Sequence, residues 1–262
     1  MIKTVIRPRM YNDSQWKALI NERPKTLLSS NSKLKKDGIW NFTLPAVCAN
    51  ILKTDGTLTN INTCQGAGAC KDFCYSSGGC YNFPHVMVKH HRNLQMMISN
   101  PFEFVDQMVE EINSKKNLKY VRWHDSGDFI PNLWALYKAV MERCPTIKFY
   151  AYTKMISFFN ALKSLNQIPS NFHVIYSFGG LEDSKIDMDK DCHSRIFKSR
   201  KELRMHGYTD CHVSDIPAAT GRNVRIGLIV HGSAVSMKII KKNGSIAKMN
   251  DKIESELLAA AV

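Results

Sequence analysis

The sequence lacks the features that mark membrane proteins, secreted proteins and dinucleotide-binding folds. No apolar run approaches the roughly 18 residues that a membrane-spanning helix requires, so we expect no membrane partner. The chain begins MIKTVIRPRM, which is polar and basic and carries no apolar signal segment. Neither a GxGxxG nor a Walker motif occurs, and this disfavours a dinucleotide-binding fold. We therefore expect a cytoplasmic protein of another class.

Long runs of like charge are also absent, although the chain is strongly basic. It holds 36 lysine and arginine residues against 23 aspartate and glutamate residues, and its formal net charge is +13. No five or six basic residues follow one another, so a disordered basic tail is not indicated. A positive field favours anionic ligands, and the expected partner is nucleic acid or another anionic substrate. A solvated surface of dispersed lysines is the alternative.

Cysteine is concentrated in one glycine-rich stretch, residues 63–81 (TCQGAGACKDFCYSSGGCY), which we call the cysteine loop. It holds four of the eight cysteines, spaced C-x5-C-x3-C-x5-C: Cys64, Cys70, Cys74 and Cys80. Glycine lets a loop fold back tightly, so thiols this close in sequence can converge on one metal centre. Without a secretory signal, clustered cysteines are more often metal ligands or catalytic groups than disulfides. Unpaired structural thiols and two disulfides are the alternatives, and Cys48, Cys192 and Cys211 receive no role.

The spacing of these thiols favours an iron–sulfur cluster over zinc. Zinc sites usually pair short C-x2-4-C knuckles, whereas the spacings here are irregular. The element CKDFCY, residues 70–75, has an aromatic residue on each side of its last cysteine and resembles the cluster loops of radical-SAM proteins. That resemblance implies that Cys64, Cys70 and Cys74 hold a [4Fe–4S] cluster with one open iron, and Cys80 is an additional thiol. The spacing departs from the usual C-x3-C-x2-C of that superfamily.

Strand-like and helix-like segments alternate along the chain. Strands are predicted at residues 39–47, 120–124, 147–152, 172–176, 209–213 and 224–230, and helices at residues 86–99, 101–114, 131–144, 156–165 and 198–206. This alternation predicts an α/β fold with mostly parallel strands. With roughly five or six such units, we expect a partial TIM-like (β/α) barrel with the cysteine loop after its first strand.

Three parts of the chain are distinguished by composition. We expect an N-terminal appendage over residues 1–38, a barrel-like domain over residues 39–235 that includes the cysteine loop, and a C-terminal extension over residues 236–262. The polar segment SSNSKLKKDG marks the first boundary. The last segment, DKIESELLAAAV, indicates a terminal helix.

Polar residues gather directly after the predicted strands, where parallel α/β folds build their sites. We expect Asp125, Asp128, Lys154 and His231 to act in catalysis, and Ser126, Gly127, Ser177 and Gly179 to bind a cofactor. Plain turn chemistry is the alternative, as is capping by Asp125 or Asp128 of the helix that begins near Pro131.

Short motifs in a fixed order resemble the phage-borne gene product 88 family. They are FTLPAV, the cysteine loop with its CY, VKHHRNL, WHDSGDF, FYAYTK, a strand ending in SF, and VHG, and they run from Trp40 to Gly232. The resemblance implies an incomplete TIM-like barrel with an iron–sulfur site at its mouth. Many family members carry a second cysteine cluster, for which this chain offers only Cys192 and Cys211.

The expected function is that of a phage-type, radical-SAM-like iron–sulfur enzyme in the host cytoplasm. Its cofactors would be a [4Fe–4S] cluster and S-adenosylmethionine, which supply the one-electron chemistry while the protein positions them. Asp125, Ser126 and Asp128 would meet the ammonium or hydroxyl groups of that ligand, and Lys154 would meet a carboxylate or phosphate. Two alternatives stay open. One is a zinc-stabilised nucleic-acid-binding protein without catalysis, and the other is an iron–sulfur hydrolase or lyase whose open iron is a Lewis acid.

Overall fold

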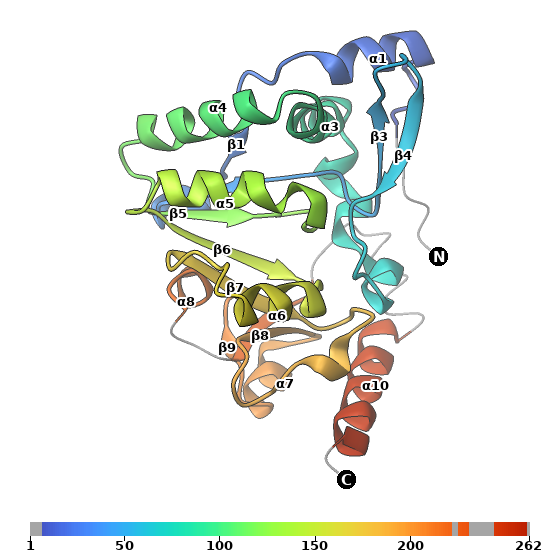
Figure 1. Ribbon diagram of the computed structural model, residues 1–262. Coiled ribbons are helices and arrows are strands. Elements are labelled where there is room, and N and C mark those ends of the chain that lie inside the picture. Colours follow the sequence, from blue (N-terminus) through green and yellow to red (C-terminus); the bar gives the residue numbers. More distant parts are fainter. Residues whose placement is uncertain (1–6, 222–224, 231–243, 261–262) are drawn as a thin grey trace.

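The computed structural model of the protein describes residues 7–221, 225–230 and 244–260. Within these residues, one large sheet is flanked by helices, and a separate hairpin stands beside it (Figure 1). No described helix is long and apolar enough to cross a membrane.

The large sheet has eight strands, and all but one of its neighbouring pairs run parallel. In spatial order they are β1 (Leu28–Ser29), β2 (Ile39–Phe42), β5 (Tyr120–Trp123), β6 (Lys148–Thr153), β7 (Phe172–Ser177), β8 (His193–Phe197), β10 (Arg225–Ile229) and β9 (Thr209–Asp210). β1 is antiparallel to β2, and each later pair is parallel. β1 and β9 are the edges, so the described sheet is open. The carboxyl ends of the parallel strands all lie along one side of it.

Helices fill the connections between the strands. They are α1 (Asp13–Asn21), α2 (Ser32–Lys36), α3 (Pro84–Ser99), α4 (Pro101–Ser114), α5 (Trp134–Arg143), α6 (Ile156–Ser164), α7 (Arg200–Met205), α8 (Ile216–Ala219) and α10 (Ser245–Ala260). Short 3-10 turns add η1 (Ala69–Phe73), η2 (Tyr75–Ser77), η3 (Gly79–Asn82), η4 (Pro131–Leu133) and η5 (Asp183–Lys185). Local sequence explains several starts: Asn12 and Gln15 form a capping box at α1, and a proline opens α3 and α4.

The two faces of the sheet bury different residues because side chains alternate along each strand. On one face, Val121 and Trp123 of β5 join the main core with side chains of α4, α5 and α6. On the opposite face, Tyr150 and Ile175 pack with residues of α2 and α8. Arg122, between Val121 and Trp123, lies on this second face over the ring of Tyr152.

The hairpin of β3 (Cys48–Leu52) and β4 (Leu58–Asn62) leads into the cysteine loop. Its turn contains Gly56 at φ +77°, a left-handed conformation that suits glycine. Helix α1 packs against α3 and β3, and its buried Trp16 donates a hydrogen bond to Asn50 Oδ1 at 3.1 Å.

The predicted α/β fold with mostly parallel strands is confirmed, whereas closure of the sheet into a barrel is not observed among the described strands. The strand predicted at residues 39–47 ends at Phe42. Pro45 has no N–H to donate, and Val47 adopts φ +63°, so the chain turns before the hairpin begins. The strand β8 is not predicted by the sequence pattern. The segment expected to be an appendage contributes β1 to the sheet.

Candidate thiol site and the adjoining pocket

The cysteine loop docks by its backbone against the segments that follow β6 and β7. The N–H groups of Gly68 and Cys70 both donate to the carbonyl of Gly179, each at 3.1 Å. A Cβ atom at Gly66 would stand 2.3 Å from the carbonyl oxygen of Lys154. Glycine is therefore required at this position, because any side chain would push the loop away from the sheet.

Cys70 and Cys74 lie close enough to Cys64 to affect the pKa of its thiol. The pKa of Cys64 is raised to about 12, first by burial and then by the nearby Asp128, Cys74 and Cys70. Burial also raises the pKa of Cys70, where Lys154 acts in the opposite direction. A thiol binds a metal only as the thiolate. Cys64 and Cys70 are therefore protonated at neutral pH, and a cationic centre would be needed to ionise them.

All eight cysteines belong to the described residues, and none of them forms a disulfide. Within the part of the chain that the structure describes, no three cysteine, histidine, aspartate or glutamate side chains form a group that could hold a metal ion. The three thiols thus interact without converging on a single point. The Sγ atom of Cys64 accepts the N–H of Val47 at 3.2 Å, and the Sγ atom of Cys74 lies 3.0 Å from the hydroxyl of Ser76.

Asp128 is buried beside these thiols, and its carboxylate accepts hydrogen bonds from other groups of the protein. Its Oδ1 accepts from the Thr153 hydroxyl at 2.7 Å and from the Phe129 N–H at 2.8 Å, and its Oδ2 accepts from the Lys154 N–H at 2.9 Å. Burial raises the pKa of Asp128, although these hydrogen bonds act against that rise. Asp128 therefore ties the segment after β5 to the end of β6.

Lys154, Ser177 and Gly179 lie in the same region. The Lys154 ammonium group donates to the Ser177 hydroxyl at 2.9 Å. Gly179 has φ +96°, and a Cβ atom there would stand 3.4 Å from the Cβ of Cys70. The structure thus brings together three predicted metal ligands with Asp128, Lys154, Ser177 and Gly179, at the carboxyl ends of β6 and β7.

Asp125, by contrast, holds the second half of the cysteine loop. Its Oδ2 accepts from the Tyr81 hydroxyl at 2.5 Å, and its main-chain carbonyl accepts from the Tyr75 hydroxyl. Ser126 and Gly127 shape the turn between the two aspartates. Ser126 donates to the carbonyl of Leu44 at 2.6 Å, and Gly127 adopts φ +80° against the same residue.

The capping alternative for Asp125 and Asp128 is wrong. Both η4 and α5 begin without a side-chain hydrogen bond to their first turn. The carboxylates are occupied instead by the tertiary contacts described above.

The remaining predicted residues lie elsewhere. Cys80 is exposed, on η3, and lines a separate pocket. Cys192 and Cys211 lie near one another in the second core cluster, where burial raises the pKa of each to about 12. Cys48 begins β3, and burial raises its pKa as well. His231 lies outside the described residues.

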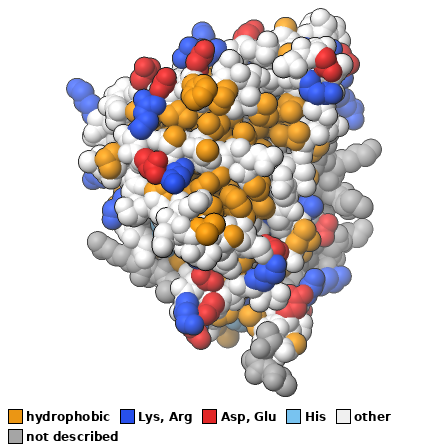
Figure 2. Space-filling model, viewed as in Figure 1, with side chains coloured by type: hydrophobic (Ala, Val, Ile, Leu, Met, Phe, Trp, Pro, Cys, Tyr) orange, Lys and Arg blue, Asp and Glu red, His pale blue; other side chains and the backbone are white. Residues whose placement is uncertain are grey.

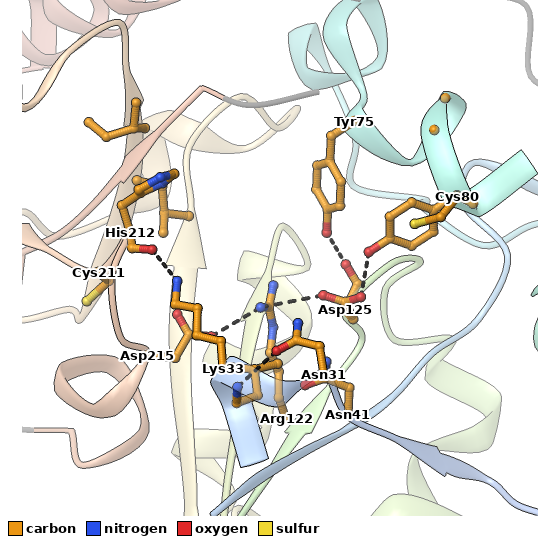
Figure 3. Close-up of a pocket in the computed structure, with 16 residues that line it drawn as sticks. Asn31, Lys33, Asn41, Tyr75, Cys80, Arg122, Asp125, Cys211, His212 and Asp215 are labelled. Atoms are coloured by element: carbon orange, nitrogen blue, oxygen red, sulfur yellow. Dashed lines mark hydrogen bonds and ion pairs between the residues drawn. The ribbon is translucent and has the colours of Figure 1, made fainter. Parts of the chain in front are cut away.

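A cavity of about 630 Å³ opens on the second face of the sheet, against the cysteine loop (Figure 3). Its walls come from α2, β2, β5, β10, the segment before α8, and η2 and η3 of the loop. The lining residues with the most informative chemistry are Asn41, Tyr75, Tyr81, Arg122, Asp125 and Asp215. We call this cavity the loop pocket.

Arg122 is the centre of the charged network in the loop pocket, between Asp125 and Asp215 (Figure 3). Its Nη1 lies 3.1 Å from Asp215 Oδ2 and 3.5 Å from Asp125 Oδ1. Asp215 also accepts the Tyr150 hydroxyl at 3.0 Å. Burial alone would lower the pKa of Arg122, but the two carboxylates outweigh it and hold that pKa above its ordinary value.

Sequence reasoning did not identify Asn41, Arg122 or Asp215 as site residues. Arg122 could have been found, because it is a charged residue at an alternate position of a predicted strand, YVRW. Asp215 gives no such signal, since it stands in a polar turn about 90 residues farther along the chain and meets Arg122 only in the fold.

The positive charge does not form a continuous patch on the face shown in Figure 2. There, basic and acidic side chains alternate around a band of apolar side chains. Several basic residues are paired, for example Arg143 with Asp106 at 2.6 Å and Arg23 with Glu103 at 3.5 Å. This face therefore offers no strongly basic surface for a nucleic-acid backbone.

The sequence is similar to one family of known proteins. The sequence model of the family described as Gene product 88 matches residues 18–244. The match takes in the cysteine loop and every strand of the sheet. No curated protein and no solved structure matches the chain.

Proposed function

The chain belongs to the Gene product 88 family, and from this premise we propose that it is a phage-type iron–sulfur protein whose cysteine loop holds a [4Fe–4S] cluster. The observation that carries the proposal is the proximity of three loop thiols: Cys70 and Cys74 lie close enough to Cys64 to raise its pKa, and Cys74 acts on Cys70 in the same way. Three such ligands leave one iron of the cluster open.

The donor set of the thiol site fits this cluster. Its ligands are thiolates, and the raised pKa of Cys64 and of Cys70 means that a cationic centre would have to ionise them. Lys154 already acts in that direction on Cys70. The backbone docking through Gly66 and Gly68 holds the loop against Lys154, Gly179 and Gly180.

A radical-SAM-like activity in a partial TIM-like barrel is the finer form of this proposal. When bound, S-adenosylmethionine and the cluster would supply one-electron chemistry. Lys154 and Ser177 are the residues of this chain that would orient a carboxylate beside the cluster. Asp128 is less suited to an ammonium group than the sequence indicated, because three protein donors already occupy its oxygens. In such a barrel the second face of the sheet, which carries the loop pocket, would be the inner one.

The zinc-binding alternative receives less support. Zinc bound by four thiolates requires ligands about 2.3 Å from one ion in a tetrahedron. The four loop cysteines include the exposed Cys80, which lines the loop pocket, and no described group of three ligands converges on one point. A four-iron cluster is larger than one ion, so thiols that are near but not convergent suit it better.

The proposal is tested by reconstitution with iron and sulfide under anaerobic conditions. Replacing Cys64, Cys70 or Cys74 by alanine should abolish incorporation of both elements and the brown colour, because three thiolates are needed to hold the cluster. Iron and acid-labile sulfide per chain are the measurements.

Cys80→Ala and Cys144→Ala are the matched controls. Cys80 lies in the same loop on a different wall, and Cys144 is buried at the end of α5. Both variants should keep the iron content of the unaltered protein. Equal iron content in all five variants, or stoichiometric zinc with no iron, would refute the proposal.

A further inference from the structure

We propose that the loop pocket receives the base of a nucleotide, either free or within a single-stranded nucleic acid. That this nucleotide is the substrate of the iron–sulfur protein rests on the function proposed above. The pocket volume of about 630 Å³ falls within the range of roughly 300–1,000 Å³ that is usual for ligand sites. A free nucleotide and a single-stranded nucleic acid both present a flat, uncharged base with N–H donors and acceptors on its edge.

Two residues that line the pocket each have a buried polar atom without a partner among the described residues. These atoms are Oδ1 of Asn41, in a residue that is 6% exposed, and Nε of Arg122. Asn41 and Arg122 are register partners on the neighbouring strands β2 and β5. One unsatisfied acceptor thus stands beside one unsatisfied donor. Because buried polar atoms are nearly always paired, this combination indicates a ligand edge with the complementary donor and acceptor.

A nucleobase edge has that complementarity. Asparagine pairs with adenine through its amide, and bases outside a duplex are read by hydrogen bonds to their edges and by stacking on aromatic rings. Tyr75 and Tyr81 form one wall of the pocket, and Leu34, Leu228 and Ile229 add apolar surface. Such surfaces accept the flat faces of a base.

The charges of the pocket also favour an uncharged group. The basic lining residues Lys33 and Arg122 are balanced by the acidic lining residues Asp125 and Asp215. A free carboxylate or ammonium group would upset this balance, whereas a neutral base would not. Lys33 is exposed, and its ammonium group donates to the His212 carbonyl at the edge of the pocket. It is the cation that would meet a phosphate at the entrance.

The test is a binding titration on metal-free protein at low salt. The probes are the four nucleoside monophosphates, the four nucleosides, and short single-stranded DNA and RNA homopolymers. We expect one base to be preferred, and Asn41→Leu to weaken its binding about tenfold, because one base-edge contact is lost. Asn113→Leu, at an exposed position of α4, should bind as the unaltered protein does.

A second pair of variants lies on the exposed surface of α2 and so does not depend on core packing. Lys33→Gln should weaken binding of the monophosphate several-fold and leave binding of the nucleoside unchanged. Lys36→Gln, which is exposed on the same helix but does not line the pocket, should change neither. A steep loss of affinity with added salt should accompany binding of the homopolymers only.

The possible results distinguish a free nucleotide from a nucleic acid, and they test nucleotide binding separately from the cluster. Binding of monophosphates as tight as that of homopolymers assigns a free nucleotide, and binding of homopolymers alone assigns a nucleic acid. If no probe binds, or if Asn41→Leu binds every probe as the unaltered protein does, the inference is overturned. Iron content is measured on separate samples. If the cluster proposal fails, the nucleotide-binding result still stands, and if no nucleotide binds, the iron measurement still stands.

Discussion

Asp128 connects three segments that are far apart in sequence. Its carboxylate accepts hydrogen bonds from Thr153 and Lys154, and its own N–H donates to the carbonyl of Thr63 at 2.8 Å. The strand end of β6 and the start of the cysteine loop therefore meet at this residue. A buried carboxyl group is stable here only because these donors replace water.

Asp128→Asn should lower the free energy of unfolding by about 1–3 kcal/mol at acidic pH, because an amide N–H₂ would face the N–H of Lys154. Burial raises the pKa of Asp128 in the folded protein. Between the unfolded and folded pKa values the folded state holds the extra proton, so the stability due to Asp128 falls as pH rises.

The stability difference between the unaltered protein and Asp128→Asn should therefore shrink as pH rises above about 4. Urea unfolding at a series of pH values measures it. Asp251→Asn, at an exposed position of α10, is the control and should leave the curve unchanged. A difference that grows with pH would show that the hydrogen bonds outweigh burial and that the folded pKa is lowered.

At the scale of elements, the cysteine loop is held by close backbone approach in addition to the side chain of Phe73, which is buried in the main core. Three of its four cysteines are only partly buried, and the fourth is exposed. A Cβ atom at Gly68 would stand 2.5 Å from the carbonyl oxygen of Gly180, which repeats the close contact at Gly66. The two glycines thus determine where the thiols lie relative to Lys154.

Gly66→Ala and Gly68→Ala should each displace the loop, and we expect iron incorporation to fall at least as sharply as thermal stability. The physical reason is that the neighbouring atoms are backbone and cannot move aside cheaply. Reconstituted iron content and the melting temperature are measured on the same samples.

Gly79→Asn is the matched control in the same loop. Gly79 has φ +59°, a conformation that asparagine tolerates, and a Cβ atom there would meet nothing within 4 Å. This variant should keep both iron content and stability. Normal iron content in Gly66→Ala would show that docking of the loop does not position the thiols.

At the scale of the whole molecule, buried histidines couple folding to pH. Burial lowers the pKa of His90 and of His91 to about 4 and that of His124 to about 3. His124 lies among aromatic rings, with the Phe129 ring centroid at 4.6 Å, and neither of its ring nitrogens has a partner among the described residues. These histidines are neutral in the folded protein at neutral pH.

The unfolded chain takes up protons at these histidines as pH falls below about 6.5, and the folded protein does not. Folded pKa values are lowered, so the unfolded state binds more protons and stability decreases as pH falls from about 7 to about 4. Each histidine should contribute about 2 kcal/mol to the loss between pH 7 and pH 5.

His124→Asn should reduce the loss of stability between pH 7 and pH 5 by about 2 kcal/mol, whatever its effect on stability at neutral pH. Asparagine suits the φ of +61° at this position and does not titrate. His85→Asn, on the exposed surface of α3, is the control and should keep the full slope. An unchanged slope in His124→Asn would show that this ring is protonated in the folded state.

Much of the secondary structure could be read from local pattern. The helices α3, α4, α5 and α6 fall where apolar spacing and opening prolines predict them, and β5, β6 and β7 fall on apolar runs. The sequence pattern did not predict β8, HSRIF, because its buried polar residues depend on tertiary contacts: His193 meets the Tyr208 hydroxyl at 3.1 Å and Arg195 pairs with Glu254 at 3.3 Å. Local pattern carries no information about such distant partners.

The sequence by itself determined the family, the mostly parallel α/β fold and the loop in which the thiols stand, because these depend on residue order and local spacing. Only the tertiary structure decided which residues meet. Asp125 lies at the loop pocket and Asp128 lies beside the thiols, although the two residues are only three positions apart in the sequence. The chain bends between them, with Gly127 at φ +80°, and the two carboxylates accept from the hydroxyls of Tyr81 and Thr153 respectively. Those donors arrive from other segments, so no pattern within the DSGD motif could assign them.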